Sequence, residues 1–177
     1  MIKLINIAAL SHKILNEFKN PNIAIDMTCG NGLDTLFLSS IAKSVFAFDI
    51  QDEAINNTQK LLDLNRIKNA IVIKESHDLY DIYVSNKIDL VIYNLGYLPS
   101  GNKLIKTESR IVINSLEKIL YQLNDFGIIV IVIYLDNLDE SNQILELTQK
   151  LGKEFDVMKY EVLNKSNSPY IIKIQKT

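Results

Sequence analysis

The sequence predicts a doubly wound α/β domain, in which a seven-stranded, mostly parallel sheet ends in an antiparallel hairpin. Three observations predict this fold. The 177 residues, 47% hydrophobic and 23% charged, suit one domain with a substantial core. Apolar segments of strand length alternate with segments of helical periodicity, which is the order of βαβ units. The early strand segments are continuous apolar runs, which is typical of parallel strands covered by helices on both faces.

The first half of the chain predicts an N-terminal helix followed by strand–helix units. Apolar residues recur at helical spacing from Ile7 to Phe18, and the Asn20–Pro21 step ends the helix because a residue before proline disfavours the α conformation. We expect residues 1–20 to pack on the core rather than to form a signal peptide, since they lack a small-residue cleavage site. The segments that follow are a strand at 23–26, a tight loop at 29–32, a helix at 34–42, a strand at 45–49, a helix at 52–65, and strands at 70–73 and 88–93.

The second half predicts two more helices and three strands. One helical stripe consists of Val112, Leu116, Ile119, Leu120 and Leu123, and a second consists of Ile144, Leu147, Thr148 and Leu151. Phe126–Gly127 opens the longest strand candidate, 128–134, and two strands follow at 156–163 and 170–175. The six residues between the last two strands are too few for a crossover helix, so this pair is predicted to be antiparallel.

Composition and charge exclude several classes of protein. The formal net charge of −2 gives no overall positive field, so affinity for nucleic acid would have to come from local basic patches. The apolar run 127–135 is too short to span a bilayer, and no membrane partner is expected. The single cysteine, Cys29, cannot form an internal disulfide or a cysteine-cluster metal site, so we expect a cytoplasmic protein without a metal. No linker or repeat divides residues 1–177, which are predicted to form one domain.

Polar segments follow four of the predicted strands. In such sheets, ligands bind beyond the carboxyl ends of the strands, at the switch in strand order. Gly30 and Gly32 allow the backbone to turn sharply and to approach a ligand closely. Asp49, 23 residues beyond Asp26, is placed to accept hydrogen bonds from ribose hydroxyls. The four segments are 26–32, 49–51, 76–78 and 94–99.

The first two of these segments fit either of two nucleotide cofactors, a dinucleotide or S-adenosylmethionine. A dinucleotide requires a third glycine for close helix packing, but Thr35 stands at that position. Asp26 and Asp34 also flank the loop, where carboxylates repel phosphate and attract the ammonium and sulfonium of S-adenosylmethionine. This pattern favours a methyltransferase over a dehydrogenase. A glycine turn without a ligand is the third interpretation.

The fourth segment carries the candidate catalytic residues. Asn94-Leu95-Gly96-Tyr97 has the spacing of the Asn/Asp-Pro-Pro-Tyr/Phe motif of methyltransferases that act on amino nitrogens. An asparagine carbonyl can orient an amine through its hydrogens, and an aromatic ring can stack on a base. Asn94 and Tyr97 are therefore the predicted catalytic pair. The alternative is a turn with a buried tyrosine.

Together these motifs resemble a known family. Asp26-x-Thr28-x-Gly30-Asn31-Gly32-x-Asp34-Thr35, Phe48–Gln51, Ser76-His77 and Asn94–Pro99 are similar to the small rRNA-methylase-like proteins of Gram-positive bacteria, and the tail 164–170 is similar to their closing hairpin. This is a class I family dependent on S-adenosylmethionine, which methylates 5-aminomethyl-2-thiouridine at the wobble position of tRNA. The resemblance covers essentially the whole chain.

The resemblance implies a role for each matching residue. Asp26, Asn31 and Asp34 would line the methionine end of the cofactor, while Asp49 would hold the ribose. Gln51 would lie by the adenine, Ser76 and His77 would close the adenine side of the site, and Asn94 and Tyr97 would face the amine. The cofactor-binding set is Asp26, Thr28, Gly30, Asn31, Gly32, Asp34, Asp49, Gln51, Ser76 and His77.

Two loops depart from the family pattern. Residues 100–103 read Ser-Gly-Asn-Lys where the family has Gly-Gly-Asp-Lys, and 134–139 lack the usual Tyr-His-Gly-His. We therefore expect an N-methyltransferase for the tRNA wobble aminomethyl group, with two alternatives: methylation of rRNA or a small amine, and a catalytically reduced cofactor-binding module. The predicted partner is the tRNA anticodon stem-loop, and a homodimer is one way to extend the binding face. His12 is interpreted as structural, with substrate contact as the alternative. The candidate phosphate contacts, which a solvated surface explains equally well, are Lys103, Lys106, Arg110, Lys165, Lys173 and Lys176.

Overall fold

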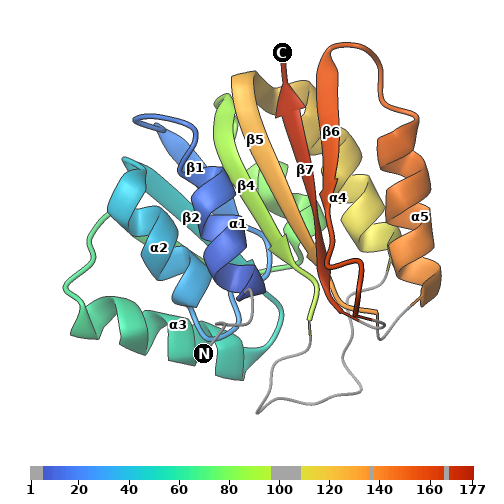
Figure 1. Ribbon diagram of the computed structural model, residues 1–177. Helices are drawn as coiled ribbons and strands as arrows, with labels where there is room; N and C mark the ends of the chain where they lie inside the picture. The colour runs from blue at the N-terminus through green and yellow to red at the C-terminus, as the bar shows by residue number, and fades with distance from the viewer. Residues whose placement is uncertain (1–5, 97–108, 136–137, 166–167) are drawn as a thin grey trace.

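A seven-stranded sheet forms the centre of the described part of the chain (Figure 1). The computed structural model describes residues 6–96, 109–135, 138–165 and 168–177. The strand order is β3-β2-β1-β4-β5-β7-β6, in which β7 runs antiparallel to β5 and β6 and the other pairs are parallel. The strands are β1 (Ile23–Asp26), β2 (Ser44–Asp49), β3 (Ala70–Lys74), β4 (Ile88–Asn94), β5 (Leu123–Ile133), β6 (Phe155–Tyr160) and β7 (Tyr170–Lys176). The predicted fold class and the antiparallel C-terminal hairpin are confirmed.

Helices cover both faces of this sheet. One face carries α1 and α2, with α3 beside α2, and the other carries the short 3₁₀ helix η1 with α4 and α5 (Figure 1). The sequence of β4 is continuously apolar because the strand is buried on both faces. Leu90 and Ile92 pack toward α1 and α2, while Val91 and Tyr93 pack toward η1 and α4. The helices are α1 (Ile7–Leu15), α2 (Leu33–Ile41), α3 (Asp52–Leu64), η1 (His77–Ile82), α4 (Ser109–Gln122) and α5 (Leu138–Gln149).

Several elements differ from the sequence prediction, and the first is α1, which ends at Leu15 rather than near the Asn20–Pro21 step. Strand β6 ends at Tyr160 rather than at 163, and η1 was not predicted because its six residues are too few for a periodic pattern. Leu123 continued an apolar helical stripe in the sequence, but it is the first residue of β5, so that assignment is wrong. The early part of β5 is irregular: Phe126 has φ +63°, and a Cβ on Gly127 would lie 2.8 Å from the Asn124 carbonyl oxygen.

Helix α1 packs across β5 and β7, next to α2. Ile14 and Leu15 are buried in the core that this face shares with α2. Just beyond α1, the Glu17 carboxylate pairs with the Lys173 ammonium of β7, and Lys173 is only 3% exposed. Lys173 is therefore neither the phosphate contact nor the solvated lysine that the sequence suggested. In the described ranges, no helix is both long and apolar enough to cross a bilayer.

Candidate cofactor and acceptor site

The carboxyl ends of β1, β2 and β4 bring the predicted site residues together. Asp26, Asp49 and Asn94 are the last residues of these three neighbouring strands. Strand β1 lies between β2 and β4. The chain builds β2 and β3 on one side of β1 and then crosses to β4 on the other side, so the strand order switches here. A doubly wound sheet binds its ligands at this edge.

The glycine loop joins β1 to α2 in a conformation that requires glycine. Gly30 and Gly32 have φ of 51° and 82°, in the left-handed region that other residues rarely adopt. A Cβ on Gly32 would lie 2.9 Å from the Cα of Thr58, so its absence lets α2 and α3 approach. The Thr58 hydroxyl donates to the Gly30 carbonyl (3.1 Å), which fixes the loop against α3. The predicted sharp turn is confirmed.

Asp49 links the ends of β1 and β2. Its Oδ2 accepts from the Gly30 backbone N–H at 3.1 Å, and its Oδ1 accepts from the Gln51 backbone N–H at 3.0 Å. Both Asp49 and Gln51 are half-buried, and Gln51 directly precedes α3. The ribose and adenine contacts assigned to these two residues stay predictions.

Asp26 is buried beneath the loop with no exposed surface. It accepts from the Thr28 backbone N–H (3.1 Å) and from the Thr35 hydroxyl (2.6 Å). Burial, reinforced by the charge of Asp34, raises its pKa to about 7. Both oxygens are used inside the protein, so Asp26 shapes the loop, and its predicted contact with the methionine end stays untested.

Asp34 connects two elements that the sequence did not link. It lies in the first turn of α2 and is 8% exposed. Its Oδ1 is 2.6 Å from the His12 Nε2 of α1, and its Oδ2 accepts from the Asn94 Nδ2 of β4 at 3.0 Å. The sequence offered no signal for the His12 contact, because 22 residues separate the two and tertiary packing alone joins them.

Thr28 and Asn31 use their side chains within the protein. The Thr28 hydroxyl accepts from the Asn94 backbone N–H (2.9 Å) and donates to the Asn94 carbonyl (3.2 Å). The Asn31 carbonyl oxygen accepts from Asn57 of α3 (3.1 Å), and Asn31 is otherwise exposed. The cofactor contacts predicted for both residues stay predictions.

His77 is buried at the start of η1 with one unsatisfied nitrogen. It is 6% exposed and lies edge-on to Tyr93, with ring centroids 5.7 Å apart. Burial lowers its pKa to about 4, so the imidazole is neutral at pH 7. Its Nε2 has no hydrogen-bond partner among the described residues. Ser76 donates to Asp78 (2.6 Å) beside it. A buried polar atom without a partner marks a place where a ligand can bind.

Tyr134 follows β5 and lies beside Gly96, which follows β4. A Cβ on Gly96 would lie 3.1 Å from the Tyr134 Cε2, so Gly96 leaves room for this ring. Burial and the charge of Asp34 raise the pKa of Tyr134. The predicted catalytic residue Tyr97, the loop 100–103 and residues 136–137 lie outside the described residues, so their predicted roles stay predictions.

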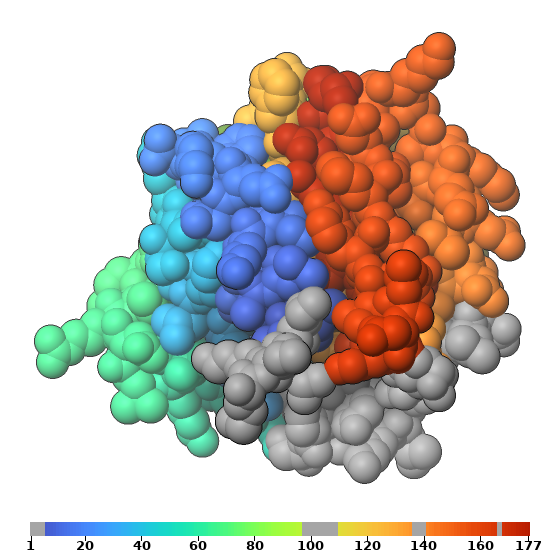
Figure 2. Space-filling view, in the orientation of Figure 1, coloured from blue at the N-terminus to red at the C-terminus, as the bar shows by residue number. Residues whose placement is uncertain are grey.

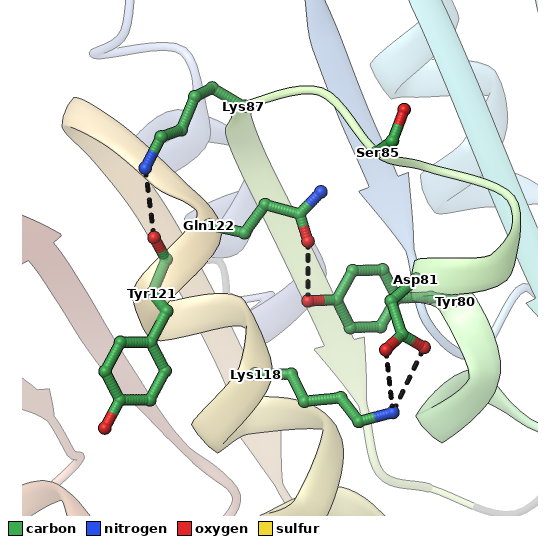
Figure 3. A pocket seen from close by; sticks show the side chains of 7 residues that line it. All are labelled: Tyr80, Asp81, Ser85, Lys87, Lys118, Tyr121 and Gln122. Atoms are coloured by element: carbon green, nitrogen blue, oxygen red, sulfur yellow. Dashed lines mark hydrogen bonds and ion pairs between the residues drawn. The ribbon is translucent and has the colours of Figure 1, made fainter.

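A cavity of about 410 Å³ lies away from this edge, between η1 and α4 (Figure 3). Lys87 immediately precedes β4 and Gln122 ends α4, so the cavity lies toward the amino ends of the strands. Both of its lysines are already paired: Lys118 with Asp81 at 3.0 Å, and Lys87 with the carbonyl oxygen of Tyr121 at 3.0 Å. Its position at the opposite ends of the strands separates it from the candidate site.

Known proteins are similar to this chain in both sequence and fold. The family model described as "Putative rRNA methylase" matches residues 45–176. A structure described as a "putative methyltransferase" from Streptococcus mutans, in complex with SAH, is 37% identical over 100% of both chains, with a TM-score of 0.92. A "putative rRNA-methylase" from Clostridium thermocellum is 36% identical over 99% of this chain and 100% of that one, with a TM-score of 0.93.

A curated relative comes from Arabidopsis thaliana and is named tRNA (mnm(5)s(2)U34)-methyltransferase, chloroplastic. It is 31% identical over 84% of this chain, and the match spans 61% of the length of that relative. The Streptococcus mutans structure holds SAH, which is S-adenosylmethionine without its transferable methyl group, so the predicted cofactor matches that of a relative. The chain therefore belongs to the rRNA methylase family, on a class I methyltransferase fold.

Proposed function

We propose that this chain transfers a methyl group from S-adenosylmethionine to the 5-aminomethyl group of the wobble uridine in a tRNA anticodon stem-loop. The observation that carries the proposal is the Asn94 side chain, held at the end of β4 by its hydrogen bond to Asp34. It supplies an amide at the position where methyltransferases of amino nitrogens orient their acceptor. The name of the Arabidopsis relative supports the same substrate class.

The residues of the carboxyl edge fit an adenosine cofactor with a cationic end. Asp49 would accept from the ribose hydroxyls, and Gln51 would lie beside the adenine. The unsatisfied His77 Nε2 gives this side of the site a buried atom that can bond the base. Asp34 places negative charge near the loop, which favours the ammonium and sulfonium. When bound, the cofactor supplies an electrophilic methyl group.

The main task of the protein in this reaction is to align the acceptor amine with the methyl group of the cofactor. An aminomethyl group is largely ammonium at neutral pH, so it would first release a proton to water. The neutral amine would then attack the methyl carbon, so that a nitrogen–carbon bond forms while the sulfur–carbon bond breaks, and the product is a secondary ammonium. The Asn94 carbonyl oxygen would accept an amine N–H and thereby direct the nitrogen lone pair toward the methyl carbon. Tyr97 would stack on the uracil ring. The site needs no strong base, because a neutral amine is already nucleophilic.

Methylation of rRNA is the second candidate, since the family description and the Clostridium thermocellum relative both carry that name. Competing acceptors can decide between the two. Wild-type protein and S-adenosylmethionine would be offered four acceptors: tRNA bearing 5-aminomethyl-2-thiouridine, the same tRNA with unmodified uridine, ribosomal RNA, and the free aminomethyl nucleoside. Mass spectrometry of the nucleosides would show which of them gains a methyl group.

The tRNA proposal expects methylation of the first acceptor alone. Methylation of ribosomal RNA alone would overturn it in favour of the second candidate, and turnover of the free nucleoside alone would indicate a small-molecule enzyme. Binding of S-adenosylmethionine without transfer to any acceptor would indicate a cofactor-binding module. The proposal also includes a cytoplasmic location, and a second protomer is the proposed means of extending the RNA-binding face.

A further inference from the structure

We propose that His12 is a positioning residue for methyl transfer, which acts through Asp34 to hold the Asn94 amide in one orientation toward the acceptor amine. This inference rests on the proposed function and adds a residue to its site. His12 stands on α1, outside the residues 45–176 that the family model matches. Its contact with Asp34 joins α1 to the edge where the cofactor and acceptor would meet.

The first step is the orientation of Asn94. An ionised carboxylate only accepts hydrogen bonds, so the Asn94 atom 3.0 Å from the Asp34 Oδ2 is the donating Nδ2. The Asn94 Oδ1 is therefore turned away from Asp34. No described residue donates to this oxygen. A reversed amide would place two acceptors together at Asp34 and present an N–H pair to the amine, which repels its hydrogens.

The second step is the orientation of Asp34. The carboxylate is 8% exposed, and a single hydrogen bond at Oδ2 would leave Oδ1 buried without a donor. The His12 Nε2, 2.6 Å away, supplies that donor. With both oxygens held, the carboxylate plane cannot rotate, and Oδ2 stays directed at Asn94. The other ionisable groups near Asp34 are Asp26 and Tyr134, and neither forms a described hydrogen bond with it.

The third step is the placement of His12 itself. Its ring stacks on Phe37 of α2, with centroids 3.9 Å apart and planes 4° apart. Helix α1 is fixed by its buried Ile14 and Leu15 and by the Glu17–Lys173 ion pair just beyond its end. Figure 2 shows this N-terminal part lodged between α2 and the C-terminal hairpin. The histidine therefore has a fixed ring plane from which to orient the carboxylate.

Three variants separate the hydrogen bond from packing. His12→Phe keeps an aromatic ring to stack on Phe37 and removes the donor, while His12→Gln places an amide N–H near the position of Nε2. Ala9→Gln, at an exposed site on the same helix, is the matched control. The measurements are kcat and KM for the aminomethyl tRNA, SAH affinity by calorimetry, and the thermal unfolding midpoint.

We expect His12→Phe to lower kcat about tenfold, the loss of one hydrogen bond to a charged group, while SAH affinity stays at the value of Ala9→Gln. Tm should also fall in His12→Phe, because the buried Asp34 Oδ1 then lacks its donor. His12→Gln should regain most of the wild-type kcat. Wild-type activity in His12→Phe would overturn the role of His12. A His12→Gln variant as slow as His12→Phe, or a loss of SAH affinity as large as the loss of kcat, would also overturn it. A wild-type protein that methylates no acceptor would instead overturn the proposed function itself.

Discussion

Thr28 and Asn94 are 66 residues apart in the chain, yet the Thr28 hydroxyl bridges the backbone N–H and the backbone carbonyl of Asn94. It accepts from the first at 2.9 Å and donates to the second at 3.2 Å. A single side chain at the end of β1 thus fixes the backbone at the end of β4. Asp34 fixes the side chain of the same asparagine, so the backbone and the side chain of Asn94 are positioned by different residues.

Replacing Thr28 by valine tests this bridge. Thr28→Val keeps the volume of the side chain but leaves the Asn94 N–H and carbonyl without their partner. We expect the free energy of unfolding to fall by about 1–2 kcal/mol, since a part-buried donor and acceptor lose a hydrogen bond. Methyl transfer should fall further than SAH affinity, because the change displaces Asn94 rather than the cofactor residues. Urea unfolding, calorimetry with SAH and acceptor kinetics measure the three quantities.

Thr148→Val is the matched control for that substitution. Thr148 is 1% exposed in α5, and its hydroxyl donates to the Leu145 carbonyl of the same helix. Thr148→Val should lower the free energy of unfolding but leave kcat at the wild-type value. Equal kinetics in Thr28→Val and Thr148→Val would contradict a positioning role for Thr28.

Substitution of Asp49 tests the proposal that this residue contacts the ribose of the cofactor. Asp49→Ala removes the acceptor for the proposed ribose hydroxyls, and we expect SAH affinity to weaken by about 2–3 kcal/mol, as expected for hydrogen bonds to a charged group. The variant also frees the backbone N–H groups of Gly30 and Gln51, so some stability should be lost as well. Calorimetric titration with SAH is the measurement.

Asp52→Ala controls for the loss of a nearby carboxylate. Asp52 opens α3 at the surface, where its side chain is 76% exposed and pairs with Lys74. The Asp52→Ala variant should bind SAH as the wild type does. Unchanged SAH affinity in Asp49→Ala would remove Asp49 from the cofactor site.

The sequence predicted the regular parts of this fold because its strands are buried on both faces. The range predicted for β1, 23–26, agrees with the structure residue for residue, since a short apolar run stands between Pro21 and the glycine loop. Leu123 was misassigned because an apolar residue that continues a helical stripe has the same pattern as the first residue of a buried strand. Lys173 was misjudged because its pairing with Glu17 depends on where α1 packs, which the local pattern does not contain.

The candidate site, like the fold, was predictable from the sequence only in part. The edge position of Asp26, Asp49 and Asn94 followed from strand–helix alternation, and the positive φ of the glycines followed from their place in a tight loop. The His12–Asp34 contact joins two helices on the same face of the sheet, and no spacing rule links residues on different helices. Local pattern therefore predicted which segments form the site, and tertiary packing decided which side chains meet.

His77 offers a test in which stability and binding change in opposite directions. His77→Phe should keep the edge contact with Tyr93 and remove the unsatisfied Nε2, so the free energy of unfolding should rise by about 1 kcal/mol. SAH affinity should fall if the adenine bonds this nitrogen. Calorimetry and urea unfolding on the same samples give both values. A variant that binds SAH as well as the wild type does would remove His77 from the adenine contacts.

Asp26 makes the stability of the protein depend on pH. Its pKa is about 7 in the folded protein, against an ordinary value of 3.8, so the folded state favours the protonated acid. The stabilising contribution is full below about pH 4 and is lost as the pH rises through about 7. Asp26→Asn keeps a neutral side chain that can accept from the Thr28 N–H, so it should not show this loss.

The comparison must be made between the two proteins at each pH, because His77 acts in the opposite sense. Its folded pKa of about 4 lies below the usual 6.5, so its contribution to stability is lost as the pH falls through that window. Urea unfolding of wild type and Asp26→Asn from pH 4 to pH 8 cancels the His77 effect. The difference in unfolding free energy should shift in favour of the variant as the pH rises, because only the wild type must then ionise a carboxyl group that has no exposed surface. A difference that stays constant with pH would show that Asp26 ionises as readily in the folded protein as in the unfolded chain.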